Sequence, residues 1–335
     1  MTGAPAPEAA SRASRRWSDA RAEPVLAGLS VLVLAVIAGM VLFVLVSAWP
    51  SFSHNGLGWF GSGGGPVDEQ LRSIQRSPAE PSRYVYELHA WPLLYGTMLT
   101  TGLALIFGLI FSLLCAVFIV EFAPPALRRA LEPIVRLLAA VPSVIYGLIG
   151  ILALGPLLGG LISEERKESV IYVVSLTGLN LTLATLILTI MITPIMIAII
   201  VNALRSVPRS WTEGSAALGV NRWRTVWKIS VRAARPAIIA AAVLATARAL
   251  GEAIMLSMVS GSFAFAPNPL DGLTFFFEPV RPLAATIVDN AEALSVKPLG
   301  QTIYAFAAVL LVSTALLSLA GWAAKQPMKK YAGRV

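Results

Sequence analysis

The chain has 335 residues, of which 56% are hydrophobic and only 13% are charged. This composition, with a positive mean hydropathy, is unusual for a water-soluble domain and favours a membrane protein. The formal net charge of +8 could suit a nucleic-acid-binding protein. The basic residues, however, are spread among short segments and form no single face with stacking aromatics, so we expect no nucleic-acid partner.

Six apolar segments are long enough to cross the ~30 Å hydrocarbon core of a bilayer, which takes roughly 20 residues. The sequence therefore predicts an all-α polytopic membrane protein with membrane lipid around it. The third segment holds Pro142 and Pro156, which a span tolerates when neighbouring helices satisfy the freed carbonyl groups. The expected spans are 25–49, 93–120, 137–162, a stretch in the second half of 170–204, 236–260 and 299–323.

Lys and Arg residues are concentrated in every second segment between the spans. Because cytoplasmic segments retain positive charge, this asymmetry predicts that both termini are cytoplasmic. The first apolar run is too long for the hydrophobic part of a cleaved signal peptide, so we expect it to remain as an anchor. The expected parts are a disordered cytoplasmic tail at 1–24, the first transmembrane helix at 25–49, an extracytoplasmic loop at 50–92, a core at 93–324 and a cytoplasmic tail at 325–335.

The outer loops differ in what their residues predict. The charged cluster at 164–168 reads as a solvated turn after the third span. In the loop at 261–298, three consecutive phenylalanines at 275–277 would be costly in open water, so we expect a re-entrant or interfacial element that folds back on the bundle. Simple packing of the loop is the alternative. The single cysteine and the two scattered histidines form neither a disulfide nor a convincing metal site.

The inner loop between the fourth and fifth spans, residues 205–235, predicts two short helices joined by a glycine. Pro208 suits the first turn of a helix, where its missing N–H costs nothing. Gly219 is expected to end that helix in a left-handed conformation, and Asn221 to cap the next one. The second helix carries Trp223 and Trp227 on one face. By itself, this pattern fits either an interfacial amphipathic helix or a protein-docking device.

The same loop resembles the EAA loop of ABC importer permeases, because Glu213 is followed at the family spacing by Gly219 and Ile229. In that family the loop is a coupling helix that docks in a groove of the cytoplasmic ATPase. Gly214 stands where the family usually has its first alanine, and Arg232 where the motif normally ends in proline. The resemblance implies an ATPase-coupling role for Glu213, Gly214, Ser215, Ala216, Ala217, Gly219 and Ile229.

Two further motifs resemble those of phosphate-specific transporter permeases of the PstC type. These are Val-Pro-Ser-Val-Ile-Tyr-Gly at 141–147 and Arg-Ala-Leu-Gly-Glu at 248–252, with Ala253 where the family more often has threonine. The resemblance implies the type I ABC importer permease fold, a bacterial inner-membrane location and import of inorganic phosphate. It also implies a PstA-like permease, a PstB-like ATPase dimer and a PstS-like phosphate-binding protein as partners.

No ATP chemistry is expected in this chain, because the phosphate-cradling pattern G-x-x-x-x-G-K-[ST] is absent from its sequence. ATP and Mg²⁺ would be bound by the partner ATPase, and the chain itself would need no cofactor. Permeases for other oxyanions, such as sulfate or molybdate, would also carry an EAA loop, so they stay open as alternatives. A stand-alone channel or secondary transporter is a further alternative, but it leaves the loop unexplained.

Arg248 and Glu252 in the fifth span are candidate solute-path residues. Ionisable groups near the centre of a membrane helix cost about 2.5 to 3.5 kcal/mol each, so they need a reason to be there. On a continuous helix the two would lie one turn apart on one face. They form either a structural ion pair or a site where Arg248 contacts phosphate and Glu252 holds the arginine in place. Ser143 and Tyr146 are expected to line the path as neutral hydrogen-bond donors.

Overall fold

The computed structural model describes residues 7–78, 80–169 and 175–332. The regular structure in these ranges is helical, apart from one isolated bridge between Gly261 and Val280. Six helical segments are long and apolar enough to cross a membrane, which confirms the predicted number of spans. The chain divides into two compact units, Met1–Ser47 and Ala48–Val335, and each is described by itself.

The first unit consists of most of helix α1 (Pro7–Asn55), which contains the predicted first span. The helix begins at Pro7, within the segment 1–24 for which the sequence predicts a disordered cytoplasmic tail. This segment is rich in alanine and arginine, which are strong helix formers. The disorder of the tail stays a prediction. Residues 1–6 lie outside the described ranges.

The second unit is a bundle built on four long helices, which are α3 (Trp91–Val117), α8 (Leu181–Arg205), α11 (Val231–Leu250) and α14 (Leu299–Ala332). Helix α8 is central, with α3, α4 (Pro125–Ala140) and α11 packed around it. In its most apolar window 67% of the residues are buried, against 33% or less in the other five spans. Asn180 begins α8 by accepting a hydrogen bond from the N–H of Leu183, as an N-cap residue does.

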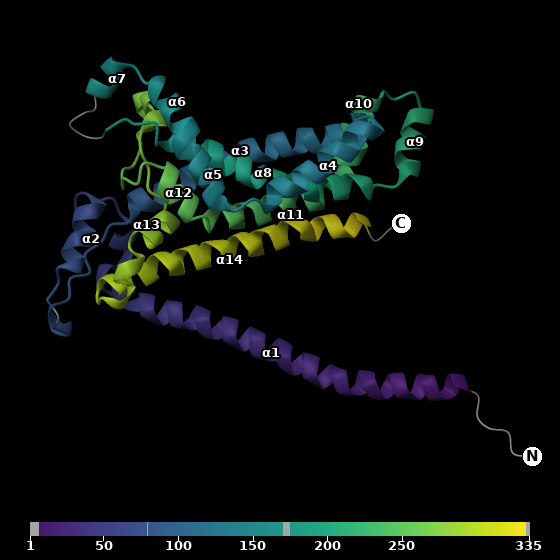
Figure 1. Ribbon diagram of the computed structural model, residues 1–335, viewed down its shortest axis with the longest axis horizontal. Coiled ribbons are helices and arrows are strands. Elements are labelled where there is room, and N and C mark those ends of the chain that lie inside the picture. Colours follow the sequence, from purple (N-terminus) through teal and green to yellow (C-terminus); the bar gives the residue numbers. More distant parts are fainter. Residues whose placement is uncertain (1–6, 79, 170–174, 333–335) are drawn as a thin grey trace, which may run out of the picture. The chain divides into compact units, whose positions relative to one another are not determined.

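Shorter helices lie at the two ends of this bundle (Figure 1). We refer to the ends as inner and outer, following the orientation predicted from the charges. The inner end carries α9 (Arg209–Ala217) and α10 (Arg222–Thr225), and the C-terminal end of α14 lies on the same side. The outer end carries α2 (Val67–Gln75), α7 (Glu164–Ser169) and α13 (Leu283–Asp289).

The third span is broken, unlike the single helix predicted at 137–162. Helix α4 ends at Ala140, and α5 (Ser143–Ile149) starts after Pro142, continuing through a π-helical turn at 150–154 into α6 (Gly155–Gly160). Pro142 lacks the N–H that would continue α4, and it biases Val141 toward an extended conformation, with ψ of 129°. The membrane-length segment therefore runs from Ser143 to Gly160.

The outer loops are folded in the described ranges. In the loop at 50–92, the side chains of Trp59, Ile74 and Leu88 are fully buried. Phe275 is packed with Leu181 and Val280. The aromatic segment at 274–277 forms a 3-10 helix that packs against α8. This part of the loop therefore lies against the bundle, and its re-entrant or interfacial position stays a prediction.

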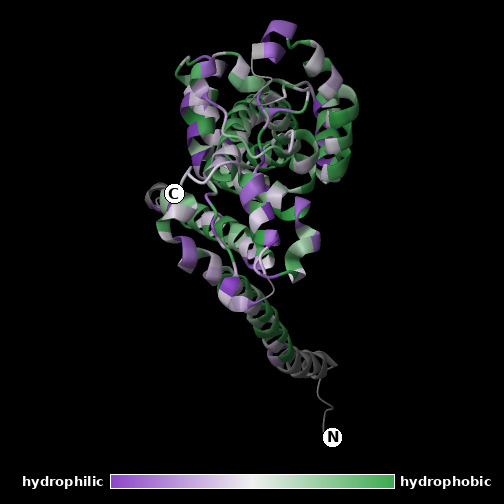
Figure 2. Ribbon diagram, turned by 90° about the vertical axis from the view of Figure 1, so that its left-hand side faces the viewer, coloured by the Kyte–Doolittle hydropathy of each residue, from purple (hydrophilic) through white to green (hydrophobic). Residues whose placement is uncertain are grey.

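The long helices carry mostly hydrophobic residues, drawn green in Figure 2, and many of these residues are exposed. On α3, Ile106, Phe107 and Ile110 are each about half exposed, and on α14 Leu316 and Leu319 are 61% exposed. Side chains of this kind on long helices suit a lipid environment, where outward apolar faces carry no penalty.

Candidate functional site

The loop between α8 and α11 has the predicted helix-turn-helix form. Helix α9 ends at Ala217, and Gly219 follows with φ of +74°. The N–H of Gly219 donates to the carbonyl of Ala216, and the N–H of Val220 to that of Ser215. This pair of bonds is the Schellman motif, in which a left-handed residue satisfies the last carbonyls of a helix. Asn221 then accepts a hydrogen bond from the N–H of Arg224 at 2.8 Å and caps α10, as predicted.

The predicted coupling residues do not all face the same way. Glu213, Gly214, Ala216 and Ala217 are exposed on α9, and Leu218 at its end is 84% exposed. A Cβ atom added to Gly214 would meet nothing within 4 Å in this chain. The alanine that the family pattern has there would therefore fit equally well.

Ser215 is the exception on α9, because it is 7% exposed. Its hydroxyl lies 2.8 Å from that of Thr225 on α10, so it joins the two helices. Ile229 is half buried in a π-helical turn, Val226–Ser230, between α10 and α11. These two residues fix the shape of the loop, and the other predicted residues form its accessible face.

An aromatic cluster holds the second helix of the loop against the end of α3. The rings of Trp223 and Trp227 pack edge to face with centroids 5.5 Å apart. Trp223 also contacts Phe122, and the Arg222 guanidinium lies 5.1 Å above the Phe122 ring. Phe122 ends a π-helical turn that continues α3. We did not identify Phe122 from the sequence, because nothing local marks a contact across 100 residues.

Arg248 is exposed near the end of α11, and within the described ranges no ion pair to it is found. Glu252 is buried, with 8% of its surface exposed. The two residues do not lie on one continuous helix, because α11 ends at Leu250 and α12 (Ile254–Val259) begins after a break. The prediction that they share a helix face was therefore wrong, since Gly251 ends the helix between them.

Glu252 has a local role in this break. One oxygen of its carboxylate accepts a hydrogen bond from the N–H of Met255 at 3.3 Å, which satisfies a free donor in the first turn of α12. A negative charge at a helix N-terminus is also favourable because of the helix dipole. Glu252 thus stabilises the start of α12.

The motif at 141–147 forms the corresponding break in the third span. Ser143 is half exposed at the start of α5. Tyr146 is 6% exposed, and its hydroxyl donates to the carbonyl of Leu138 at 2.9 Å. Tyr146 therefore joins the two sides of the break. Its hydroxyl proton is used in the hydrogen bond to the Leu138 carbonyl.

The two short helices after these breaks pack against each other. A Cβ atom at Gly147 would lie 2.8 Å from Sδ of Met258, and one at Gly150 would lie 2.6 Å from Cγ1 of Val259. Only glycine allows α5 and α12 to approach this closely. The motifs at 141–147 and 248–252, which are about 100 residues apart, therefore meet through the helices that follow them.

Comparison with known proteins places these features in a family context. Residues 108–325 match the family described as binding-protein-dependent transport system inner membrane component. The chain is 32% identical over 262 residues to the probable ABC transporter permease protein YqgH of Bacillus subtilis, which covers 78% of each chain. It is 26% identical over 299 residues to the phosphate transport system permease protein PstC of Pasteurella multocida, which covers 87% of this chain and 86% of that one.

A third relative is the probable phosphate transport system permease protein PstC of Methanocaldococcus jannaschii, 32% identical over 239 residues, with 68% of this chain and 72% of the relative covered. Among solved structures, a bacterial alginate ABC transporter bound to its alginate-carrying periplasmic protein is similar in fold. Its TM-score is 0.57 at 14% identity, and the match covers 94% of this chain and 99% of that one.

Proposed function

The chain belongs to the family of binding-protein-dependent transport system inner membrane components, and from this premise we propose that it is a permease subunit for the ATP-driven import of inorganic phosphate. The observation that carries the proposal is the loop between α8 and α11. It holds α9 as an exposed helix at one end of a bundle of membrane-length helices. The choice of phosphate is supported by the relatives that are named phosphate permeases.

Helix α9 is the surface to which a cytoplasmic ATPase docks. The exposed residues of its C-terminal half, Gly214, Ala216 and Ala217, are small, as close approach of a partner requires, and Glu213 adds a charge for recognition. The turn at Gly219 and the contact between Ser215 and Thr225 make the loop a rigid unit. A displacement of α9 is therefore transmitted to α8 and α11, between which the loop is fixed. A PstB-like ATPase dimer would supply the nucleotide and Mg²⁺, so this chain hydrolyses no ATP itself.

Arg248 is the residue of this chain that contacts the anion. Its guanidinium is exposed on a helix rich in alanine, which allows a PstA-like partner permease to pack closely beside it. Two parallel N–H groups suit two phosphate oxygens better than an ammonium would. Because Arg248 has no acidic partner in the described ranges, its charge remains available to the solute.

A PstS-like binding protein would deliver phosphate to the outer end of the bundle, in the inner membrane of a bacterium. The ATPases would then close and open on α9, and the path would be exposed first outward and then inward. Ser143 lies at the helix break, at the start of α5, and is the neutral donor that remains for the path. Tyr146 instead supports the break.

Two alternative functions can each be distinguished from phosphate import by one experiment. A permease for sulfate or molybdate would have the same loop and differ in the solute that stimulates it. A stand-alone channel or secondary transporter would need no ATPase. Purification of the tagged chain from its native membrane tests this second alternative, because we expect a P-loop ATPase to copurify with it. A chain that purifies without an ATPase and still conducts phosphate would contradict the proposal.

A further inference from the structure

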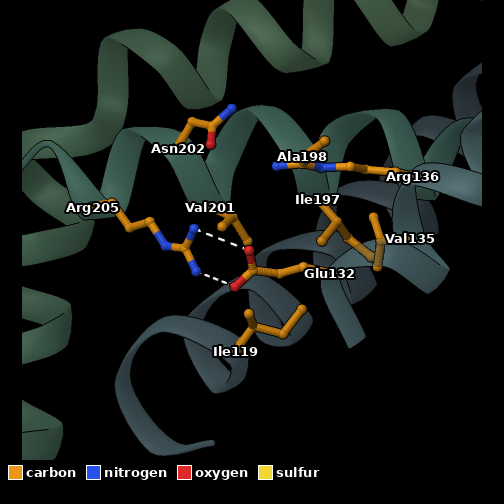
Figure 3. Close-up of a pocket in the computed structure, with 9 residues that line it drawn as sticks. All are labelled: Ile119, Glu132, Val135, Arg136, Ile197, Ala198, Val201, Asn202 and Arg205. Atoms are coloured by element: carbon orange, nitrogen blue, oxygen red, sulfur yellow. Dashed lines mark hydrogen bonds and ion pairs between the residues drawn. The ribbon is translucent and has the colours of Figure 1, made fainter. Parts of the chain in front are cut away.

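An ion pair lies at the inner end of the bundle, where α4 and α8 meet (Figure 3). The guanidinium of Arg205 faces the carboxylate of Glu132 and donates two hydrogen bonds, one to each oxygen. The pair borders a small hollow of about 30 Å³ whose walls come from both helices. Two parallel bonds of this kind fix the relative orientation of the groups that they join.

This pair differs from the simple surface pairs of the chain. Its side chains are 37% and 23% exposed, and it joins residues 73 positions apart. The Lys167–Glu164 pair, by comparison, lies within one short helix, and its glutamate is 80% exposed. A pair within a turn stabilises that turn alone. The Glu132–Arg205 pair connects α4 to the end of the span formed by α8.

Arg205 is the last residue of α8, and Pro208, three residues later, is the N-cap of α9. The pair therefore lies where the loop that carries α9 begins. Glu132 is in the middle of α4, which the pair and apolar contacts of Leu131 and Val135 hold against the core. If the start of this loop moves relative to α4, the pair must break. If the pair stays intact, α4 must move with the loop.

From α4 a continuous set of contacts leads to the candidate path. The Tyr146 hydroxyl joins α5 to the carbonyl of Leu138 at the end of α4. Gly147 of α5 and Gly150 at the start of the following π-helical turn then pack directly on α12, whose first turn Glu252 caps. Each step is a hydrogen bond or a close packing contact within one compact unit. Coupling between distant sites is carried by such contiguous networks of rigid elements.

We propose that Glu132 and Arg205 are a positioning pair that transmits movement of the α9 loop through α4 and α5 to α12 and the solute path. The proposal rests on the proposed function, because it assigns to this pair the step between ATPase docking and transport. Neither residue belongs to the accessible face of α9. Loss of the pair therefore uncouples ATP hydrolysis from transport and leaves the ATPase bound.

The test uses the whole complex in proteoliposomes, with the partner permease, the ATPase and the binding protein. The variants are Glu132→Gln, Arg205→Gln and the double change, with Glu164→Gln as the matched control at an exposed pair. Charge reversal is less suitable, because Arg128 and Arg136 also act on Glu132 and would repel a cation there. Labelled phosphate moved per ATP hydrolysed is measured, together with the amount of ATPase that copurifies.

Each single change is expected to lower phosphate moved per ATP by about threefold or more, and the double change to be no worse than the more affected single. The ATPase copurifies in parent amounts, and Glu164→Gln behaves as the parent. Arg205→Lys, which keeps the charge, retains more coupling than Arg205→Gln. Single variants with parent coupling, or losses that multiply in the double variant, would overturn the proposal.

A second readout separates this proposal from the identity of the solute. Stimulation of ATP hydrolysis by the loaded binding protein is compared with the unstimulated rate in the same proteins. We expect the single variants to lose stimulation even if another oxyanion proves to be the cargo. Parent stimulation in both single variants would contradict the role of the pair. A parent complex that moves no phosphate would contradict the proposed function.

Discussion

The Tyr146 hydroxyl donates a hydrogen bond to the Leu138 carbonyl at 2.9 Å, across the helix break at Pro142. In an unbroken helix the N–H of residue 142 would bond to this carbonyl, but proline has none. The carbonyl accepts instead from the Tyr146 hydroxyl of the following helix and, at a longer 3.3 Å, from the N–H of Val141. Tyr146, within the motif at 141–147, therefore has a structural role.

Tyr146→Phe is expected to lower the stability of the chain by about 1 kcal/mol, the typical net value of one hydrogen bond. The apparent KM for phosphate should stay at the parent value, because the hydroxyl does not serve the solute. Thermal unfolding of the purified complex and uptake kinetics check the two statements together. A raised KM with unchanged stability would instead make Tyr146 a path residue.

Arg248→Ala is expected to reduce phosphate uptake by about 10- to 100-fold, the effect of losing a hydrogen bond to a charged group. Arg248→Lys should keep part of the activity, because it keeps the charge and loses the planar donor pair. Uptake of labelled phosphate into proteoliposomes measures both, with Arg83→Ala in an exposed outer position as the control. Since no ion pair joins Arg248 to Glu252, the exchange Arg248→Glu with Glu252→Arg should not restore uptake, and restoration would contradict this account.

Gly219→Ala is expected to weaken the association of the ATPase severalfold. An alanine at φ of +74° pays roughly 1–2 kcal/mol of steric strain, and the turn that positions α9 loosens. Gly214→Ala, also on the α9 loop, is the informative comparison, because an added Cβ there meets nothing and alanine favours a helix. Pull-down of the ATPase by each tagged variant decides the matter. Equal losses in both variants would show that the left-handed turn is not the cause.

Glu278 gives a prediction about pH. Burial raises the pKa of its carboxyl, and nearby Asp271 adds to this, whereas the hydrogen bond from the N–H of Asn268 opposes it. The stability contributed by this group is therefore full below the ordinary glutamate pKa of about 4.3 and is lost as pH rises through the raised folded-state value. Glu278→Gln, which can still accept from Asn268, should raise the melting temperature by a few degrees at pH 8 and less at pH 5.

Melting of the intact complex at the two pH values measures this effect, with Glu69→Gln on the exposed face of α2 as the control. A glutamine variant that melts below the parent at pH 8 would show that the ionised carboxylate is needed there.

Local features of the chain could be predicted well from the sequence. The number of spans follows from apolar length, which requires no knowledge of neighbours. The turn at Gly219 and the cap at Asn221 follow from backbone conformations that few residues adopt. The relation between Arg248 and Glu252 was predicted wrongly, because helical spacing holds only while the helix continues and Gly251 ends it.

Contacts between distant segments could not be predicted. Glu132 and Arg205 are separated by 73 residues, and either could have been one more solvated charge. Phe122 looks like any apolar residue at the end of a span until α10 is seen to lie on it. Such pairs depend on how α4 and α3 pack against the rest of the bundle, and no local pattern carries that information.

The most direct test of the central claim is the ATPase activity of the reconstituted complex with its binding protein loaded with phosphate or with sulfate. We expect the phosphate-loaded protein to stimulate hydrolysis and the sulfate-loaded one to leave it near the unstimulated rate. Stimulation by sulfate and not by phosphate would contradict the assignment of this permease to phosphate import.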